Sequence, residues 1–448
     1  MVRSKLPSWM FLAALLAAAP PGCGGGGGGG GDGDGSGGSS RSGDASSSGA
    51  TTTDTGAATT SPVDPLAACG PVGAAWSRCE QNPLAASGHA HPDARVELSI
   101  GDPNVFFDEE DGVWKAWWST GLAPSFTAPE GEIEMGIKYA ESPDGVVWDI
   151  QEELTISAKP GSGEWDQFKL ETPSVVKVPA NPPERRYLLA YSGAQGTRSI
   201  SVGGQSVPVA WYQIGVAFSA DGKHFTRVPA AESAYAGKDT GYPSHEGLGL
   251  LGEDMLADTP GVADGLVADP ELFVEDGVIH LFASSMAVND KGEPLNFGVS
   301  HATSTDGIHW TPQPANPQVV GGVGPSLVKV PDTNEYVLFY AQDTDAEKAT
   351  MPSVFNPYLG VWRRTSTDLV TWSDAGPGRD FTWDGGQKSE VYGLIAVGDM
   401  TYRDGVFRYY YPGWSAEGVP EGFVCPLQDG TYPPAVIVLN LALRAAAP

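Results

Sequence analysis

The stretch STDGIHW at residues 304–310 belongs to a short pattern that occurs four times in this chain. The other copies read SPDGVVW at 142–148, SADGKHF at 219–225 and STDLVTW at 366–372. An Asp-Gly pair supplies the positive backbone angles that tight hairpin turns need, and the closing aromatic ring packs back on the sheet. Self-similarity at such long intervals predicts a fold built from repeated units.

A second repeated element lies upstream of each hairpin and marks the start of a strand at a proline. Its copies read DPNVF at 102–106, TPSVV at 172–176, DPELF at 269–273 and GPSLV at 324–328. An apolar, aromatic strand follows each copy. A looser fifth unit around residues 400–411 lacks the proline, and its closing strand comes either from 435–441 or from the segment before the first copy.

The two elements together predict about five units, each a four-stranded antiparallel meander. No long amphipathic helix is evident. Five such sheets arranged radially make an all-β, five-bladed β-propeller, which avoids long exposed sheet edges and needs no single large core. A pair of β-sandwiches is the alternative fold.

The first 62 residues predict export and tethering. Residues 1–23 combine a basic start, a short apolar stretch and Cys23 after a glycine, as in a lipoprotein-type signal peptide whose cysteine takes a lipid. Ordinary secretion is the alternative. Residues 24–62 are a Gly/Ser-rich disordered tether, and 63–448 form the propeller. We therefore expect a bacterial cell-envelope protein, lipid-anchored at the outer membrane or secreted.

The remaining cysteines suit an oxidising compartment. Cys69 and Cys79 are ten residues apart and form the favoured disulfide, which leaves Cys425 without a partner. Cys425 pairing with either of the other two is the alternative, and the sequence does not choose.

The charge of the chain excludes several classes of partner. The formal net charge is −29, and the first 62 residues hold only three basic and four acidic residues, so the acidity belongs to the folded part. An acidic body repels nucleic acid and anionic membrane surfaces. We expect contact with a membrane through the lipid anchor only, and a monomer.

Acidic residues recur at the entrance of the strands that begin at a proline. In a propeller the innermost strands line a central channel, so Asp102, Glu171 and Asp269 are predicted to converge from three blades. A cluster of carboxyl groups is costly unless it is protonated, paired or used. It also meets the requirement for glycoside cleavage, which needs one protonated acid and one base or nucleophile. An Asp before a proline can alternatively be a plain turn residue.

The DPNVF stretch and the closing STDLVTW hairpin resemble the five-bladed glycoside hydrolases of families 43, 32 and 68, over about residues 95–440. The resemblance implies cleavage of an extracellular oligo- or polysaccharide, with no cofactor. It implies that Asp102 is the base or nucleophile. Glu171 would then be the acid and Asp269 the group that tunes the pKa of the others.

The chain departs from the pattern of these families in its third blade. They carry a Glu acid there, two residues before the proline, where this chain has Ala268. Glu171 has that spacing in blade two, and Glu271 is a further candidate. The departure favours an alternative function, a carbohydrate-binding or scaffolding propeller without hydrolysis. A purely structural surface protein is a third possibility.

Further residues are candidates for substrate contact. Trp165 and Trp383 stand in polar, Gly-rich contexts and are predicted to stack on sugar rings, and His245 lies in a long insertion between blades two and three. Glu390, in the loose fifth unit, is another channel candidate. Asp254, Asp258 and Asp264 are a weak signal for structural Ca²⁺, because their spacing is not that of a calcium loop.

Overall fold

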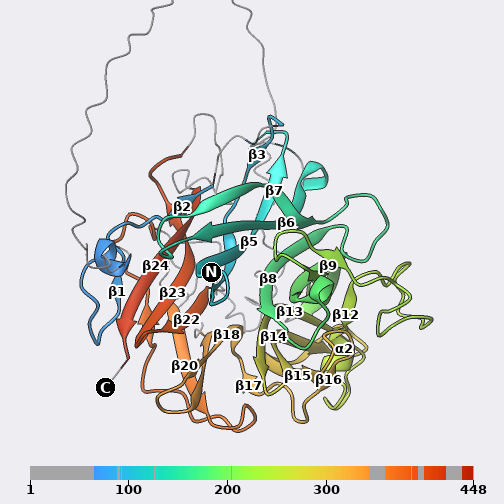
Figure 1. Ribbon diagram of the computed structural model, residues 1–448. Coiled ribbons are helices and arrows are strands. Elements are labelled where there is room, and N and C mark those ends of the chain that lie inside the picture. Colours follow the sequence, from blue (N-terminus) through green and yellow to red (C-terminus); the bar gives the residue numbers. More distant parts are fainter. Residues whose placement is uncertain are drawn as a thin grey trace, which may run out of the picture.

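The computed structural model describes residues 65–87, 91, 93–125, 128, 130–202, 204–342, 359–384, 386–391, 398–419 and 436–446. Within these ranges the protein consists of five antiparallel sheets around one axis, so the predicted five-bladed β-propeller is confirmed (Figure 1). Helical structure there is limited to short segments, and none is long and apolar enough to cross a membrane. These segments are η1 (Pro65–Cys69), η2 (Glu130–Glu132), η3 (Pro183–Arg185) and α2 (Gly252–Met255).

The strands marked by a proline are the innermost strands of their blades, as predicted. They contact one another in a closed ring around the axis, each touching the inner strand of the next blade. In chain order they are β4 (Gly101–Asp108), β8 (Lys169–Lys177), β13 (Asp264–Glu275), β18 (Val323–Val330) and β22 (Asp399–Arg403).

Each blade continues outward in chain order from its inner strand. The second strands are β5 (Val113–Ala123), β9 (Tyr187–Val202), β14 (Val278–Val288), β19 (Glu335–Ala341) and β23 (Val406–Ser415). The third strands are β6 (Glu134–Ser142), β10 (Gln205–Ser219), β15 (Pro294–Ser304), β20 (Gly360–Ser366) and β24 (Val436–Ala445). The outer strands of blades one to four are β7 (Asp149–Ser157), β11 (Thr226–Arg227), β16 (Thr311–Pro312) and β21 (Phe381–Thr382). Short strands β3 (Val96–Glu97), β12 (Leu248–Leu250) and β17 (Val319–Val320) add to blades one to three.

Blade five closes the ring with segments from both ends of the chain. Its third strand is β24, and its outer edge is formed by β1 (Ser77–Arg78) and β2 (Ala85–Ala86) from the N-terminal side. Both segments that the sequence offered as alternatives are therefore used. The Cys69–Cys79 disulfide is present next to β1, while Cys23 and Cys425 lie outside the described residues.

The repeated hairpin motif joins the third and fourth strands in blades one to four. In its first copy the Ser142 hydroxyl accepts a hydrogen bond from the Gly145 N–H at 2.8 Å, and the Asp144 carboxylate accepts from the next two backbone N–H groups. Gly145 has φ +77°, and in the fourth copy Leu369 adopts φ +61° at the same position. The motif is thus a turn held by its own Ser and Asp side chains, as its composition predicted.

Hydrogen bonds between polar side chains and backbone link the inner strands into a closed polar ring. In each blade the residue after the proline, or Asp399 in blade five, accepts a bond from a backbone N–H of the next blade. The acceptors are Asn104, Ser174, Glu271, Ser326 and Asp399, and the donors are the N–H groups of Val175, Leu272, Leu327, Met400 and Val105. This ring satisfies backbone groups that the buried axis hides from water.

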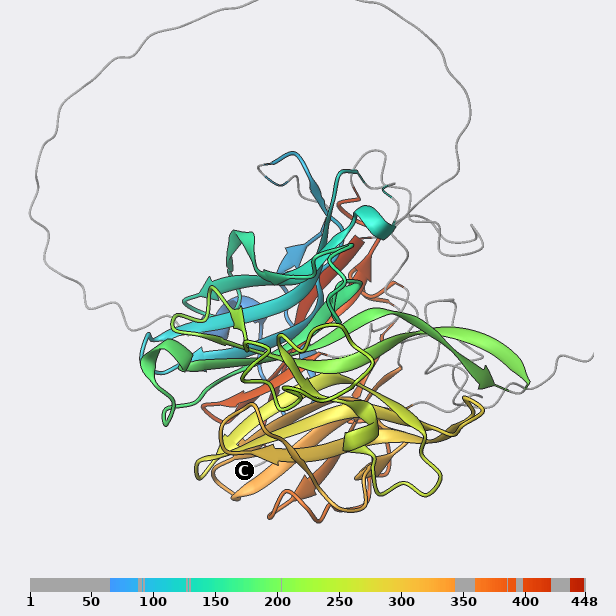
Figure 2. The same cartoon turned by 90° about the vertical axis from the view of Figure 1, so that its right-hand side faces the viewer.

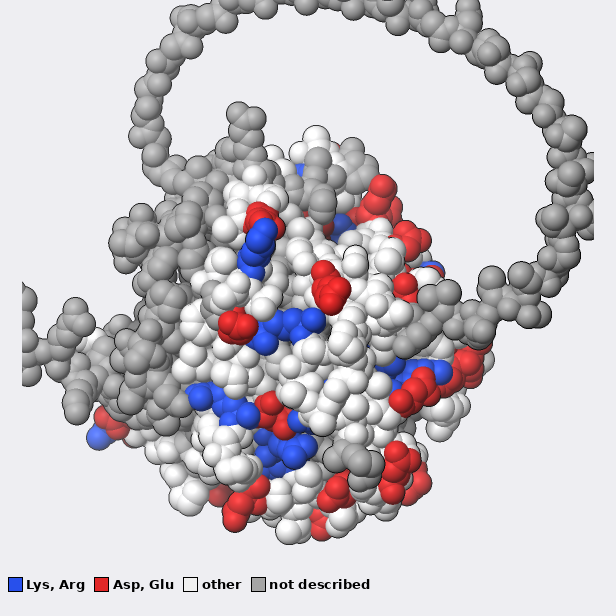
Figure 3. Space-filling model, turned by 90° about the vertical axis from the view of Figure 1, so that its left-hand side faces the viewer, with Lys and Arg blue, Asp and Glu red and all other residues white. Residues whose placement is uncertain are grey.

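One face of the molecule shows how the charged side chains are distributed. Lys and Arg stand among Asp and Glu in small groups there, and neither sign forms a continuous patch (Figure 3). Ion pairs such as Arg185 with Glu232 illustrate this mixing elsewhere on the surface.

Candidate active site

The residue before each proline interrupts the inner strand in the same way in blades one to four. Asp102, Thr172, Asp269 and Gly324 have φ between +49° and +58°, and the pairing with the second strand shifts at each of them. Positive φ is uncommon for residues other than glycine and is a marked outlier for a β-branched Thr. Gly324 has no side chain and yet adopts the same backbone angle, so the geometry of the blade imposes this angle. At the break in strand pairing, the side chains of Asp102, Thr172 and Asp269 turn away from the paired strands.

Serines at equivalent positions of three second strands join neighbouring blades at this level. Ser119, Ser192 and Ser284 accept hydrogen bonds from the N–H groups of Thr172, Asp269 and Gly324, each in the following blade, at 2.6 to 2.9 Å. Each serine also bonds a side chain of its own blade. Ser284 donates to the Asp269 carboxylate at 2.7 Å, Ser192 bonds the Thr172 hydroxyl, and Ser119 bonds Asp102. The serines thereby fix the two aspartates in place.

The three predicted carboxyl groups interact electrostatically at the entrance of the channel. Burial raises the pKa of Asp102 well above its usual range, and the negative charges of Glu171 and Asp269 raise it further. Burial and the charge of Glu171 raise the pKa of Asp269 to about 6, against the opposing hydrogen bond from Ser284. Asp102 and Asp269 are half-buried and Glu171 is buried. Asp102 therefore lies within electrostatic range of both Glu171 and Asp269.

We call Asp102, Glu171 and Asp269 the carboxyl cluster. Tyr212 is a fourth side chain that contacts it. Its hydroxyl donates a hydrogen bond to Glu171 Oε1. Burial raises the pKa of Tyr212 well above its usual value, and the charges of Glu171, Asp269 and Asp102 raise it further. Tyr212 is therefore a phenol, not a phenolate, at any physiological pH.

This arrangement is able to carry out acid–base chemistry. Burial and like charges raise the pKa of one carboxyl group, Asp102, and a second, Glu171, accepts a hydrogen bond. Carboxyl groups whose environments separate their pKa values are the requirement for a general acid beside a base or nucleophile.

A separate buried pair of carboxyl groups lies in the polar ring. Burial and the charge of Asp399 raise the pKa of Glu271 well above its usual range, and burial raises the pKa of Asp399 to about 7. Both side chains accept backbone hydrogen bonds from the next blade. Glu271 therefore belongs to the polar ring, not to the carboxyl cluster for which the sequence also offered it.

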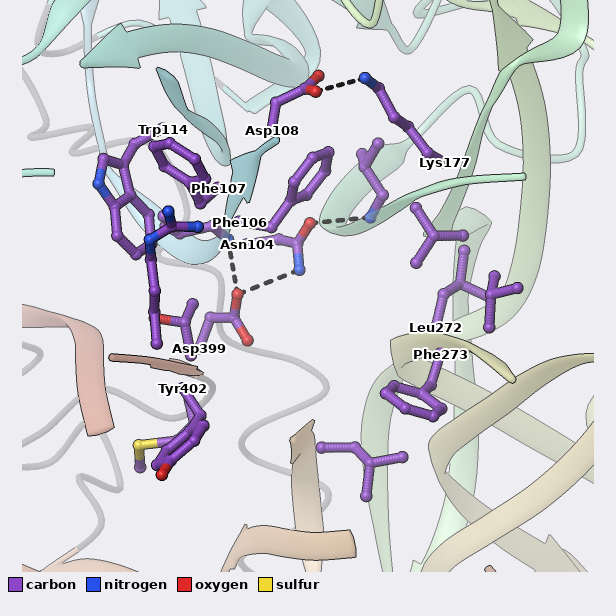
Figure 4. Close-up of a pocket in the computed structure, with 18 of the residues that line it drawn as sticks. Asn104, Phe106, Phe107, Asp108, Trp114, Lys177, Leu272, Phe273, Asp399 and Tyr402 are labelled. Atoms are coloured by element: carbon purple, nitrogen blue, oxygen red, sulfur yellow. Dashed lines mark hydrogen bonds and ion pairs between the residues drawn. The ribbon is translucent and has the colours of Figure 1, made fainter. Parts of the chain in front are cut away.

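A cavity of about 530 Å³ opens at the other end of the channel. Phe106, Phe273 and Tyr402 line it, and the Asp108–Lys177 ion pair lies on its wall (Figure 4). Strand β4 begins at the carboxyl cluster and ends at this cavity, with the polar ring between them. The cavity is thus distinct from the carboxyl cluster.

Two predicted substrate contacts are wrong. Trp165 is fully buried, stacks on Tyr191 and donates its ring N–H to the Glu246 carbonyl at 2.7 Å, so it belongs to the core between blades one and two. Glu390 is also fully buried, and it pairs with Arg78 at 2.7 Å and accepts a bond from Tyr411. Its charge is therefore used to dock strand β1, not to meet a ligand.

The other accessory candidates stay predictions. Trp383 is half-buried and donates its ring N–H to the Glu390 carbonyl at 2.6 Å. His245 is half-buried with Nε2 2.8 Å from the Thr240 hydroxyl. In the described part of the chain, no group of three or more His, Cys, Asp or Glu is arranged to hold a metal ion. Asp254 instead accepts a bond from Tyr235, and Asp264 pairs with Arg198.

Sequence reasoning missed the serines and Tyr212. Each serine pairs in the ladder with the residue two before the proline of its own blade: Gly101, Glu171 and Ala268. Aligning the second strands of the repeat would have found them. Tyr212 gives no such signal, because it is one of several aromatic residues in a buried strand.

Comparison with known proteins gives similarity at the level of the fold. No model of a known protein family matches the chain, and no curated protein matches it either. Among solved structures, a protein described as a glycoside hydrolase has 15% sequence identity and a TM-score of 0.51, covering 81% of this chain and 95% of its own.

Two further solved structures agree with this. A putative glycoside hydrolase from Parabacteroides distasonis has 16% identity and a TM-score of 0.51, covering 84% of this chain and 98% of its own. A third structure is described under the GH130 family of mannoside phosphorylases, containing glycoside hydrolases that target β-1,2 mannosidic linkages in Candida mannan. It has 17% identity and a TM-score of 0.51, covering 85% and 97% of the two chains. The chain therefore has the fold of five-bladed glycoside hydrolases, as its repeats predicted.

Proposed function

We propose that this protein hydrolyses O-glycosidic bonds of an oligo- or polysaccharide. The observation that carries the proposal is the carboxyl cluster, in which Glu171 and Asp269 from two further blades lie close enough to Asp102 to raise its pKa. The fold shared with glycoside hydrolases supports it. Paired carboxyl groups flanking the scissile bond are the usual machinery of this reaction.

The protonation of the cluster favours a particular division of roles. Because burial and the neighbouring negative charges favour the protonated form of Asp102, Asp102 is suited to donate a proton to the leaving oxygen. Glu171, which accepts the Tyr212 hydrogen bond, is then the base or nucleophile. Asp269, with a pKa of about 6, is ionised at pH 7, and its charge holds the proton on Asp102. The family resemblance implies the reverse roles for Asp102 and Glu171.

The charge of the protein favours neutral or cationic glycans. The net charge is −29, and the carboxyl cluster adds local negative charge. An anionic sugar would meet repulsion on approach and again in the site. The bond to be cleaved and the sugar itself are for the experiment to find.

A non-catalytic carbohydrate-binding propeller is the second candidate. Ala268, which is buried, occupies the place where the resembling families carry their acid in blade three. If neither Asp102 nor Glu171 replaces that acid, the channel would bind a glycan without cleaving it.

The cellular location is part of the proposal. The sequence of residues 1–62 and the Cys69–Cys79 disulfide both support an extracytoplasmic protein, tethered through a lipid on Cys23.

A screen of neutral glycans with the full chain tests the proposed function. We expect the wild-type protein to release reducing ends from at least one arabinan, xylan, fructan or mannan, and Asp102→Asn to lower kcat/KM on that glycan by about 10²–10⁴-fold. The melting temperature should not fall, because the substitution removes a buried acid. Glycan binding without turnover in the wild type would favour the carbohydrate-binding candidate.

Activated substrates separate the two role assignments. A dinitrophenyl glycoside of the same sugar has a leaving group that needs no proton. If Asp102 is the acid, Asp102→Asn should retain most activity on this compound while Glu171→Gln loses it. The opposite pattern would restore the roles that the family resemblance implies.

A further inference from the structure

We infer that Tyr212 is a positioning residue for the reaction, a buried side chain whose hydroxyl fixes the Glu171 carboxylate. This role rests on the proposed function, but its structural part does not. The repeated sequence motifs do not include Tyr212. Among the described hydrogen bonds, blades one, three and four have no counterpart of the bond from Tyr212 to Glu171.

A β-bulge lies opposite Trp211 of strand β10. Ala210 pairs with Thr197 and Tyr212 pairs with Ala194, so two residues of β9, Gln195 and Gly196, lie opposite the single residue Trp211. The bulge bends the hairpin next to Tyr212, and bulges are frequent beside active sites.

Contacts with blade three hold the bulge in place. The hairpin of β9 and β10 is longer than its counterparts and extends past the other blades (Figure 2). Ile200 and Val209 of this hairpin belong to one buried cluster with Leu266 of β13. The Arg198 guanidinium lies 5.0 Å from the Trp211 ring centre and pairs with Asp264 of blade three.

The hairpin therefore belongs to the blade that carries Glu171 and packs on the strand that carries Asp269. Glu171 lies on β8 in blade two, and Asp269 lies on β13 in blade three, against which the hairpin packs. Tyr212 itself is buried and cannot exchange its partner for water without moving the hairpin.

The charges around Tyr212 determine whether its hydroxyl acts as a hydrogen-bond donor or, once ionised, as a nucleophile. Glu171 on β8, Asp269 on β13 and Asp102 on β4 all oppose its ionisation. A phenol in this setting keeps its proton and acts as a permanent hydrogen-bond donor. Its donation to Oε1 leaves Oε2 of Glu171 as the oxygen available to a substrate or water.

Tyr212→Phe removes the hydroxyl and keeps the ring, and Tyr411→Phe is a matched control. Tyr411 is a buried tyrosine that donates to Glu390, a buried glutamate outside the carboxyl cluster. We expect Tyr212→Phe to lower kcat at least tenfold with little change in KM, and to move the acidic limb of the pH–rate profile to higher pH. Tyr411→Phe should change the melting temperature but neither kinetic quantity.

A second readout does not depend on activity. In protein labelled with ¹³C at the glutamate side-chain carboxyl, the resonance missing from Glu171→Gln identifies Glu171. We expect Tyr212→Phe to shift that resonance and Tyr411→Phe to leave it unchanged. An unchanged Glu171 resonance in Tyr212→Phe would overturn the positioning role even if the enzyme is active. A shifted resonance in a protein without any hydrolysis would support the contact and count only against the proposed function.

Discussion

Buried acidic side chains in this protein differ in what surrounds them. Glu390 is paired with the Arg78 guanidinium through two hydrogen bonds of 2.7 and 2.9 Å. Asp102 has no cation among the groups that set its pKa, and two carboxylates raise it instead. A buried charge with a partner is structural, whereas a buried acid beside other acids must hold a proton. The difference separates the docking residue from the candidate catalytic one.

Removal of Arg78 tests this distinction. We expect Arg78→Ala to lower the free energy of unfolding by about 3–5 kcal/mol, because it leaves Glu390 charged and buried without a partner. Chemical denaturation measures the loss. Lys388→Ala, which breaks the exposed pair with Glu417, is the control and should cost less than about 1 kcal/mol. Arg78→Met with Glu390→Leu should recover most of the stability, and equal losses in Arg78→Ala and the control would refute the argument.

Individual site residues were only partly predictable from the sequence. Asp102, Glu171 and Asp269 could be found because a proline follows closely after each of them in its own unit. Trp165 was misassigned because a polar, Gly-rich neighbourhood was taken as a sign of exposure. Its ring is instead buried and stacks on Tyr191.

At the scale of elements, the repeated hairpin motif carries more information than any one strand. In each copy the serine and aspartate supply the acceptors that close the turn, so the motif specifies its own local structure. The turn apex also contacts the preceding blade: Trp117 donates to the Gly222 carbonyl at 2.8 Å, and Tyr410 to the Gly145 carbonyl at 3.1 Å. A local motif therefore sets the packing of one blade on the next.

For the inner strands, the repeated sequence elements predict the strand order but not the contacts between blades. Their order and the role of the proline followed from the repeat, but the positive φ before the proline did not. The hydrogen bonds of the polar ring and of the linking serines join residues of different blades. Such contacts depend on how sheets pack around an axis, and a pattern within one unit does not contain that information.

At the scale of the whole molecule, closure of the ring gathers acidic groups around the axis. Four groups there, Asp102, Asp269, Glu271 and Asp399, have raised pKa values in the folded protein, and Asp166 and Glu253 add to them. The folded state then binds more protons than the unfolded chain, so stability falls as pH rises from about 4 to 7. Hairpin aspartates act in the opposite sense, because backbone hydrogen bonds lower their pKa, to about 2 for Asp306 and Asp368. Their contribution is lost as pH falls below about 4.

These two opposing effects predict a stability maximum at mildly acidic pH. We expect the melting temperature at pH 5 to exceed that at pH 8 by several degrees at constant ionic strength, measured by calorimetry. Asp399→Asn together with Glu271→Gln should reduce this difference, because two of the four groups no longer titrate. A melting temperature that is higher at pH 8 than at pH 5 would show that the buried acids are not protonated as described.

The central claim is that three carboxyl groups from three blades act as one hydrolytic unit. The most direct measurement is kcat/KM on the best neutral glycan for Asp102→Asn, for Glu171→Gln and for the protein carrying both substitutions. We predict that each single substitution removes nearly all turnover and that the double variant is hardly worse, because residues acting as a unit are not additive. Losses that multiply in the double variant, or hydrolysis that survives both substitutions, would contradict the claim.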